Sequence, residues 1–116
     1  MHLSTYLKSK IHRATITDTQ LEYDGSVAID PEIMQEANIK LYEQIEIYNE
    51  TNGQRWTTYV IEAGKGSREI SVRGPGARLC MPGDILVMCT YLTTRFRCPK
   101  PTQIRLNEFN TVIRKY

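Results

Sequence analysis

The sequence predicts a mainly β protein in which short strands close into a small barrel, with one or two short helices. Several short segments alternate apolar and polar residues, and glycine, proline and asparagine turn signals separate them. Only one short stretch has the features of a helix. Many short strands with little helix favour a closed barrel, because closure removes unpaired strand edges.

Each expected element has its own local signal. An aspartate cap followed by proline and an early acidic residue predicts a short helix over residues 31–37. The dipeptide Asn52-Gly53 is a strong hairpin signal between two alternating segments. Alternation, or an apolar run of strand length, predicts strands at residues 10–17, 27–29, 43–48, 55–63, 69–72, 85–92 and 103–106.

Length and composition limit the possible classes of protein. A chain of 116 residues suits one domain, so we expect a single domain over residues 1–116. With 24% charged and 41% hydrophobic residues, the chain is typical of globular proteins and unlike a disordered one. No segment approaches the run of about 20 apolar residues that crosses a membrane, and the first residues are too polar for a secretion signal. We therefore expect a cytoplasmic protein with no membrane partner.

The cysteines and the basic residues suggest little specific chemistry. Cys80, Cys89 and Cys98 are odd in number and have neither C-x-x-C spacing nor suitably placed histidines, so we expect reduced thiols and no metal site. The net charge is only +2, but basic residues outnumber acidic ones after residue 90. They are either a solvated tail or a contact for an anionic partner or a second subunit.

The dipeptide Gly25-Ser26 places a hydroxyl directly after a glycine, in a turn between two segments with apolar patterning. Glycine accepts positive φ angles and leaves its carbonyl carbon open to a neighbouring nucleophile. If the fold presses the Ser26 hydroxyl onto the Gly25 carbonyl, an N-to-O acyl shift gives an ester. Elimination and hydrolysis then leave a pyruvoyl group at position 26. By itself, a Gly-Ser dipeptide in a turn indicates an ordinary loop.

The wider sequence resembles the pyruvoyl-dependent L-aspartate α-decarboxylases from about residue 7 to about residue 92. The matching blocks appear in the family's order: Lys10-Ile11-His12-Arg13, Tyr23-Asp24-Gly25-Ser26, Ala28-Ile29-Asp30, Thr51 to Tyr59 and Gly66-Ser67-Arg68. The resemblance implies a closed six-stranded double-psi β-barrel that assembles as a homotetramer, with active sites between neighbouring subunits. It also implies cleavage into chains 1–25 and 26–116, and the need for a maturation helper protein as a further partner stays open.

The implied reaction converts L-aspartate to β-alanine and CO2, which feeds pantothenate and coenzyme A biosynthesis. The pyruvoyl group from Ser26 takes the substrate's amine as a Schiff base, so neither pyridoxal phosphate nor a metal is expected. By resemblance, Tyr59 returns a proton to Cα. Arg55 holds a carboxylate through its guanidinium fork, and Lys10 supplies a second cation.

The resemblance also implies roles in maturation and in the pocket wall. Thr58 is the expected donor that polarises the Gly25 carbonyl and also contributes to the substrate site, with Tyr23 and His12 close by. The backbone of Gly74, Pro75 and Gly76 is expected to shape the substrate pocket.

Two features of the sequence complicate this assignment. Strand alternation places Arg55 and Tyr59 opposite Thr58, so a twist or bulge is expected to redirect at least one of them. Arg73 and the pair Pro75-Gly76 also depart from the family's usual asparagine and Ala-Ala. We expect the Arg73 side chain to point towards the pocket and to slow maturation.

Two other interpretations stay open at this stage. Residues 25–33, followed by residues 37–39 and 43–47, also resemble the swapped-hairpin barrels of bacterial DNA-binding transition regulators. That module would bind a nucleic acid, whereas the resemblance to the decarboxylases implies no nucleic-acid partner. It would also leave Arg55, Tyr59 and the Gly25-Ser26 pair unexplained. The other interpretation is an inactive relative that is never cleaved.

Overall fold

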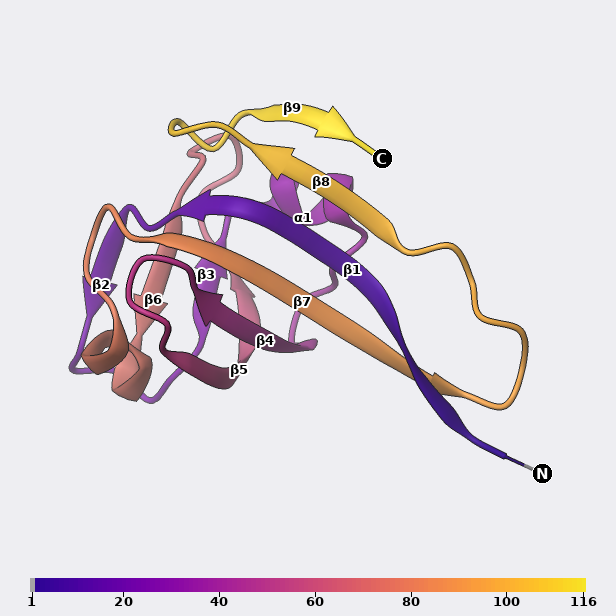
Figure 1. Cartoon of the computed structure of the whole chain (residues 1–116). Helices are drawn as coiled ribbons and strands as arrows, with labels where there is room; N and C mark the ends of the chain where they lie inside the picture. Colours follow the sequence, from indigo (N-terminus) through magenta and orange to yellow (C-terminus); the bar gives the residue numbers. More distant parts are fainter. Residues whose placement is uncertain (1) are drawn as a thin grey trace.

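The computed structural model describes residues 2–116, and over this range the protein is mainly β (Figure 1). It contains one α-helix, α1 (Pro31–Ala37), and one 3-10 helix, η1 (Gly74–Leu79). The strands are β1 (Ser4–Thr15), β2 (Asp18–Gln20), β3 (Val27–Ile29), β4 (Gln44–Asn49), β5 (Arg55–Glu62), β6 (Ile70–Arg73), β7 (Ile85–Thr94), β8 (Thr102–Leu106) and β9 (Val112–Lys115).

The expected helix is confirmed with the bounds that its capping signals predicted. Asp30 accepts a hydrogen bond from the backbone N–H of Glu32, and Asn38 ends the helix in the left-handed conformation. All seven expected strands are present, although β1 begins earlier and ends earlier than residues 10–17. The sequence analysis missed β2 and β9, because both are short and lack a clear apolar alternation.

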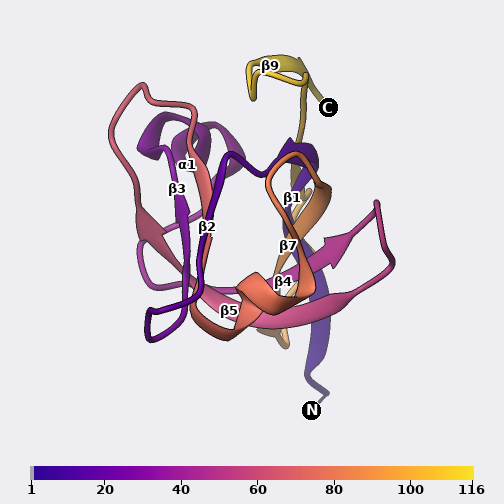
Figure 2. The same cartoon turned by 90° about the vertical axis from the view of Figure 1, so that its left-hand side faces the viewer.

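The nine strands form one sheet with the order β2-β6-β3-β5-β4-β7-β1-β8-β9. The structure has nine strands where the resemblance implies six, and β2 and β9 stand at the two ends of the sheet order, so a closed six-stranded barrel is not confirmed. Even so, the sheet curls strongly, so that β2, β3 and β6 lie across from β1 and β7 (Figure 2). Three of its pairs are parallel: β1 with β8, β2 with β6 and β3 with β5.

The inner surface of the curled sheet holds an apolar core rich in isoleucine. β-branched side chains pack well on a pleated surface, which explains their dominance here. Strand alternation selects them: in β4, Ile45 and Ile47 are fully buried, whereas Gln44 and Glu46 face outward. The largest fully buried side chains are Ile11, Ile16, Ile29, Ile33, Ile45, Ile47, Ile70, Leu86, Met88, Ile104, Leu106 and Val27.

The buried carboxylate of Asp30 joins α1 to the loop that precedes β6. Its oxygens accept hydrogen bonds from the backbone N–H groups of Glu32 at 2.9 Å, Gly66 at 2.9 Å and Arg68 at 2.8 Å. Burial alone would raise the pKa of Asp30, but these three donors, with the Arg68 charge, lower the pKa below its usual value. Because Asp30 directly follows β3, this clamp also fixes the strand that begins after Ser26.

Residues 102–106 and 112–115 of the C-terminal region form strands, while its basic residues Arg95, Arg97, Lys100, Arg114 and Lys115 are exposed. Strand β8 pairs with β1, and β9 pairs with β8. Arg114 stacks on the ring of Tyr116, and Lys115 forms an ion pair with Glu36 of α1 at 3.5 Å. Between β8 and β9, the buried side-chain amide of Asn110 accepts a hydrogen bond from the Thr15 backbone N–H and donates one to the Thr15 carbonyl oxygen. Several of the basic residues therefore have partners within the chain itself.

Two other expectations concern the thiols and the membrane. Cys80, Cys89 and Cys98 are all free thiols, as expected. Burial and the neighbouring Asp84 carboxylate raise the pKa of Cys80 to about 11, so this thiol is protonated at neutral pH. None of the helices within residues 2–116 has the length and apolar character needed to span a membrane.

Candidate active site

The Gly25-Ser26 segment is held in a strained conformation at the start of β3. Gly25 has a φ of 144° and Ser26 a φ of 96°, a region that residues with a side chain rarely adopt. Ser26 is only 1% exposed, and its hydroxyl finds no hydrogen-bond partner within residues 2–116. A buried polar atom without a partner is costly and calls for an explanation, such as a catalytic role. The hydroxyls of Thr15 and Thr90 share this feature, but of the three residues only Ser26 also has a positive φ.

Strand β5 supplies two of the expected residues to this segment. The Thr58 hydroxyl oxygen accepts a hydrogen bond from the Ser26 backbone N–H at 3.0 Å. At the next residue of β5, the edge of the Tyr59 ring lies against Gly25. A Cβ added to Gly25 would be 3.9 Å from Tyr59 Cε1. Thr58 and Tyr59 therefore both adjoin the bond between Gly25 and Ser26.

Of the twist or bulge that was expected in β5, the bulge is absent. The pairing of β4 with β5 runs without a register shift, and exposure alternates regularly from Arg55 to Val60. No redirection is needed, because β3 pairs in parallel with β5 from Val27 opposite Val60. The preceding Gly25-Ser26 segment runs beside Thr58 and Tyr59, where it can be contacted from both faces of the strand.

The start of η1 forms a wall against the same segment. Gly74 has a φ of 76°, and a Cβ added to it would lie 2.6 Å from the Gly25 nitrogen and 2.7 Å from the Tyr23 carbonyl oxygen. Two residues later, a Cβ at Gly76 would lie 2.6 Å from the indole nitrogen of Trp56. A side chain at either position would collide with these neighbours, so the close packing requires glycine at both. Pro75 between them is exposed.

Arg73 contacts the segments on both sides of the Gly25-Ser26 bond. Its backbone N–H donates to the Ser26 carbonyl oxygen at 3.0 Å. Its guanidinium carbon lies 5.0 Å from the centre of the Tyr23 ring, and Nη1 is 3.4 Å from the Tyr23 hydroxyl oxygen. The side chain thus lies over Tyr23, so it is neither free in solvent nor directed at the Ser26 hydroxyl.

The other expected residues lie on the outer face of the sheet. His12, Val87, Tyr48 and Arg55 form one row across β1, β7, β4 and β5. Arg55 stacks on Tyr48, with 4.8 Å from its guanidinium carbon to the ring centre. Three strand spacings separate His12 from Arg55, which is roughly 14 Å along the sheet. Within one chain, the structure therefore brings Thr58, Tyr59 and Gly74 to Ser26, but it does not bring His12 there.

Lys10 and His12 share a face of β1, as expected from strand alternation. They line a cavity of about 40 Å³ together with Gln103, Ile104 and Tyr116. Partial burial, followed by the charges of Lys10 and Arg105, lowers the pKa of His12 below its ordinary value. The ring is therefore mainly neutral at physiological pH. Glu50 lies 3.9 Å from its Nε2.

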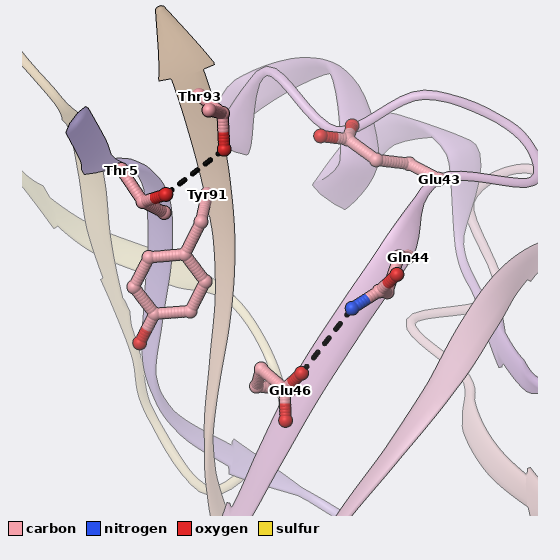
Figure 3. Close-up of a pocket in the computed structure, with 6 residues that line it drawn as sticks. All are labelled: Thr5, Glu43, Gln44, Glu46, Tyr91 and Thr93. Atoms are coloured by element: carbon pink, nitrogen blue, oxygen red, sulfur yellow. Dashed lines mark hydrogen bonds between the residues drawn. The ribbon is translucent and has the colours of Figure 1, made fainter. Parts of the chain in front are cut away.

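A larger cavity, of about 530 Å³, lies on the outer face above β4 and β7 (Figure 3). None of the residues expected in the active site lines it. Its acidic residues already have partners: Glu43 pairs with Lys8 at 3.0 Å, and Glu46 accepts from Thr57 at 2.7 Å. Size alone therefore does not locate the chemistry, and the strained Ser26 segment is the better guide.

The sequence analysis missed residues that support the pocket wall. Trp56 packs beneath Gly76, and alternation did place its side chain on the inner face of β5. The buried Asp84 carboxylate accepts hydrogen bonds from Asn49 Nδ2 at 2.9 Å and from the Met81 N–H at 3.0 Å. Asn49 Nδ2 also donates to the Leu79 carbonyl, which ties the end of η1 to β4. A polar residue at an inward position of β4 was the only signal for this network.

Comparison with known proteins agrees with this geometry. Residues 1–113 match the family model described as aspartate decarboxylase. The chain belongs to the aspartate decarboxylase family. The match extends beyond residue 92, where the resemblance noted in the sequence ended, and includes β8 and part of β9. Membership in this family favours the decarboxylase interpretation over the DNA-binding module.

Several curated relatives carry the name aspartate 1-decarboxylase. The protein from Methylococcus capsulatus is 45% identical over 114 residues, which cover 96% of this chain and 90% of the relative. The one from Nitrosococcus oceani is 47% identical over 111 residues, or 93% of this chain and 88% of the relative. The one from Thioalkalivibrio sulfidiphilus reaches 53% identity over 89 residues, which cover 77% and 71% of the two chains.

Proposed function

We propose that this protein cleaves its own chain between Gly25 and Ser26 and then decarboxylates L-aspartate to β-alanine and CO2. The product would feed pantothenate and coenzyme A biosynthesis. The observation that carries the proposal is the buried, unpartnered Ser26 hydroxyl in a strained backbone beside Gly25. Strain and a missing hydrogen bond both raise the energy of the uncleaved segment, so reaction at this bond relieves them. The names of the curated relatives support the choice of aspartate as substrate.

Maturation begins when the Ser26 hydroxyl oxygen attacks the Gly25 carbonyl carbon. The C–N bond breaks, the nitrogen of Ser26 becomes a free amine, and an ester joins the two residues. Loss of the Ser26 α-proton and cleavage of its Cβ–Oγ bond release the Gly25 carboxylate. The dehydroalanine that remains at position 26 rearranges to an imine, and its hydrolysis by water releases ammonia and leaves a pyruvoyl group there. Thr58 accepts from the Ser26 N–H, so its own proton is available to the developing oxyanion at Gly25.

In the mature protein, the pyruvoyl group would supply the electron-withdrawing ketone that decarboxylation requires. The residues present fit this role, because position 26 adjoins Tyr59 and the Gly74 wall. The phenol of Tyr59 is suited to return a proton to Cα. The guanidinium of Arg55 and the ammonium of Lys10 are suited to bind the two carboxylates of aspartate.

The proposed site needs a second copy of the chain. Lys10 and His12 lie on the far side of the outer face from Arg55, so one subunit does not bring them to position 26. A neighbouring subunit that presents its own β1 would complete the site. A homotetramer of double-psi barrels is part of this proposal. The strong curl of the sheet and the parallel pairs β2·β6 and β3·β5 support the barrel part of it.

Intact-mass spectrometry of the purified protein tests the proposal. The wild type is expected to give fragments 1–25 and 26–116, with pyruvoyl in place of the N-terminal serine. The Ser26→Ala variant is expected to remain one chain and to release no CO2 from aspartate. A wild type that stays full-length and still decarboxylates aspartate would disprove the pyruvoyl mechanism. Cleavage of the protein purified alone would show that it needs no helper protein.

Two substitutions separate turnover from maturation. Arg55→Lys keeps the charge but loses the bidentate fork, and Tyr59→Phe loses only the proton donor. Both variants are expected to be cleaved like the wild type and to lose about 100-fold or more in kcat/KM for aspartate. Cleavage is measured on a denaturing gel and turnover by CO2 release. Equal losses in both measurements would assign these residues to the fold and not to the reaction.

A further inference from the structure

Arg73 holds chain segments that become separate products after cleavage. Its backbone N–H bonds the Ser26 carbonyl oxygen on the C-terminal side. Its side chain stacks on Tyr23 on the N-terminal side, while Nε lies 3.4 Å from the Ser71 hydroxyl oxygen, which helps to orient it. No other role in the proposed reaction accounts for this side chain.

The segment that Arg73 contacts also covers the reactive position. Tyr23 and Asp24 are exposed, whereas Ser26, which follows them closely in the sequence, is 1% exposed. Gly74 packs against the backbone of Tyr23 and Gly25, so the segment lies between solvent and the wall of the site. Aspartate can reach position 26 only if the end at Gly25 moves after cleavage. How far that end moves depends on what still holds Tyr23.

Cleavage changes the charge next to Arg73. The proposed maturation leaves a carboxylate on Gly25, two residues from the ring on which the guanidinium stacks. A guanidinium binds a carboxylate through charged hydrogen bonds while its flat face remains stacked on an aromatic ring. The end that must move therefore acquires a group that Arg73 can bind.

We propose that Arg73 is a positioning residue that retains the new end at Gly25 beside the site, through the Tyr23 stack and an ion pair with the Gly25 carboxylate. The stack exists before cleavage and the ion pair only afterwards. This inference rests on the self-cleavage proposed above. Through these contacts, Arg73 limits the access of substrate to position 26. This role differs from those of the residues that bind or protonate aspartate.

Amide hydrogen exchange of residues 21–25, followed by mass spectrometry, tests this proposal in two states. In the uncleaved Ser26→Ala background, Arg73→Gln removes the stack on Tyr23 and the side-chain hydrogen bonds to Tyr23 and Ser71, and we expect exchange to rise about threefold. In the cleaved protein the same substitution also removes the ion pair, and we expect a rise of about tenfold or more. Arg73→Lys keeps the charge and is expected to restore part of the protection in the cleaved protein.

The matched control is Arg78→Gln, which removes an exposed cation from η1, the 3-10 helix that directly follows Arg73. It is expected to leave exchange at residues 21–25 unchanged. The proposal is overturned if Arg73→Gln has the same effect in both states, has none, or is equalled by Arg78→Gln. An equal rise in the β4–β5 hairpin would show a general loss of stability and would also overturn it. The mass of the wild type is measured before any exchange experiment. If it shows no cleavage, the proposed function is wrong, and this failure is distinct from a failure of the proposal for Arg73.

Discussion

Gly74→Ala is expected to slow cleavage at Gly25-Ser26 by about 100-fold and to destabilise the fold by about 2–4 kcal/mol. The added Cβ would lie 2.6 Å from the Gly25 nitrogen and 2.7 Å from both the Gly25 Cα and the Tyr23 carbonyl oxygen. All three are backbone atoms, so they cannot rotate away as a flexible side chain can. The segment must shift, and a shift of about 1 Å is enough to spoil the attack of the Ser26 hydroxyl.

Gly53→Ala is the matched control for this substitution. Gly53 has a φ of 79°, close to the 76° of Gly74, but nothing within residues 2–116 lies within 4 Å of its added Cβ. It therefore carries the backbone strain of about 1 kcal/mol without the steric clash. Cleavage is followed as the processed fraction over time, and stability by urea unfolding. If Gly74→Ala is cleaved as fast as Gly53→Ala, the close contact does not position the bond.

Asp30→Asn is expected to lower the free energy of unfolding by about 2–4 kcal/mol at pH 7. The carboxylate of Asp30 accepts from three backbone N–H groups, whereas an amide offers only one acceptor oxygen. One donor, such as that of Arg68, would then face an NH2 group in a buried site. The measurement is urea unfolding in the Ser26→Ala background, so that cleavage does not contribute.

The effect of Asp30 should depend on pH in a defined direction. Its pKa is lower in the folded protein than in the unfolded chain, so its stabilisation is complete above about pH 4. As the pH falls through the folded pKa, the carboxylate is protonated and the difference between wild type and Asp30→Asn should shrink. Glu108→Gln, an exposed carboxylate, is the control and should change stability little at any pH. A difference that stays constant down to pH 2 would contradict the assignment.

Local signals in the sequence were sufficient for the helix α1, for most of the strands and for the choice of Gly25-Ser26 as the candidate cleavage point. The capping residues around Pro31 gave the correct bounds of α1, since a helix start depends on the few residues beside it. Alternation correctly put Thr58 on one face of β5 and Arg55 and Tyr59 on the other. Gly25-Ser26 was selected because glycine permits the backbone angles that the structure shows.

Contacts between distant segments were beyond the reach of these signals. The bulge expected in β5 was wrong because periodicity describes one strand and not the strand that lies beside it. The parallel pairing of β3 with β5 places Ser26 next to Thr58 and Tyr59, and only the tertiary structure contains that pairing. The order of the nine strands likewise depends on crossovers that no local pattern specifies.

The sequence by itself therefore determined which residues carry the groups that the proposed reaction would use: a hydroxyl after a flexible glycine, a guanidinium and a phenol. Side-chain chemistry and backbone preference are properties of single residues and their neighbours, so they can be read from the chain directly. Only the tertiary structure decided that Gly74 packs against Gly25, that Arg73 stacks on Tyr23 and that His12 lies far from Arg55 in the same subunit. These relations follow from the packing of segments about 50 residues apart, where a single added Cβ decides whether two backbones can meet.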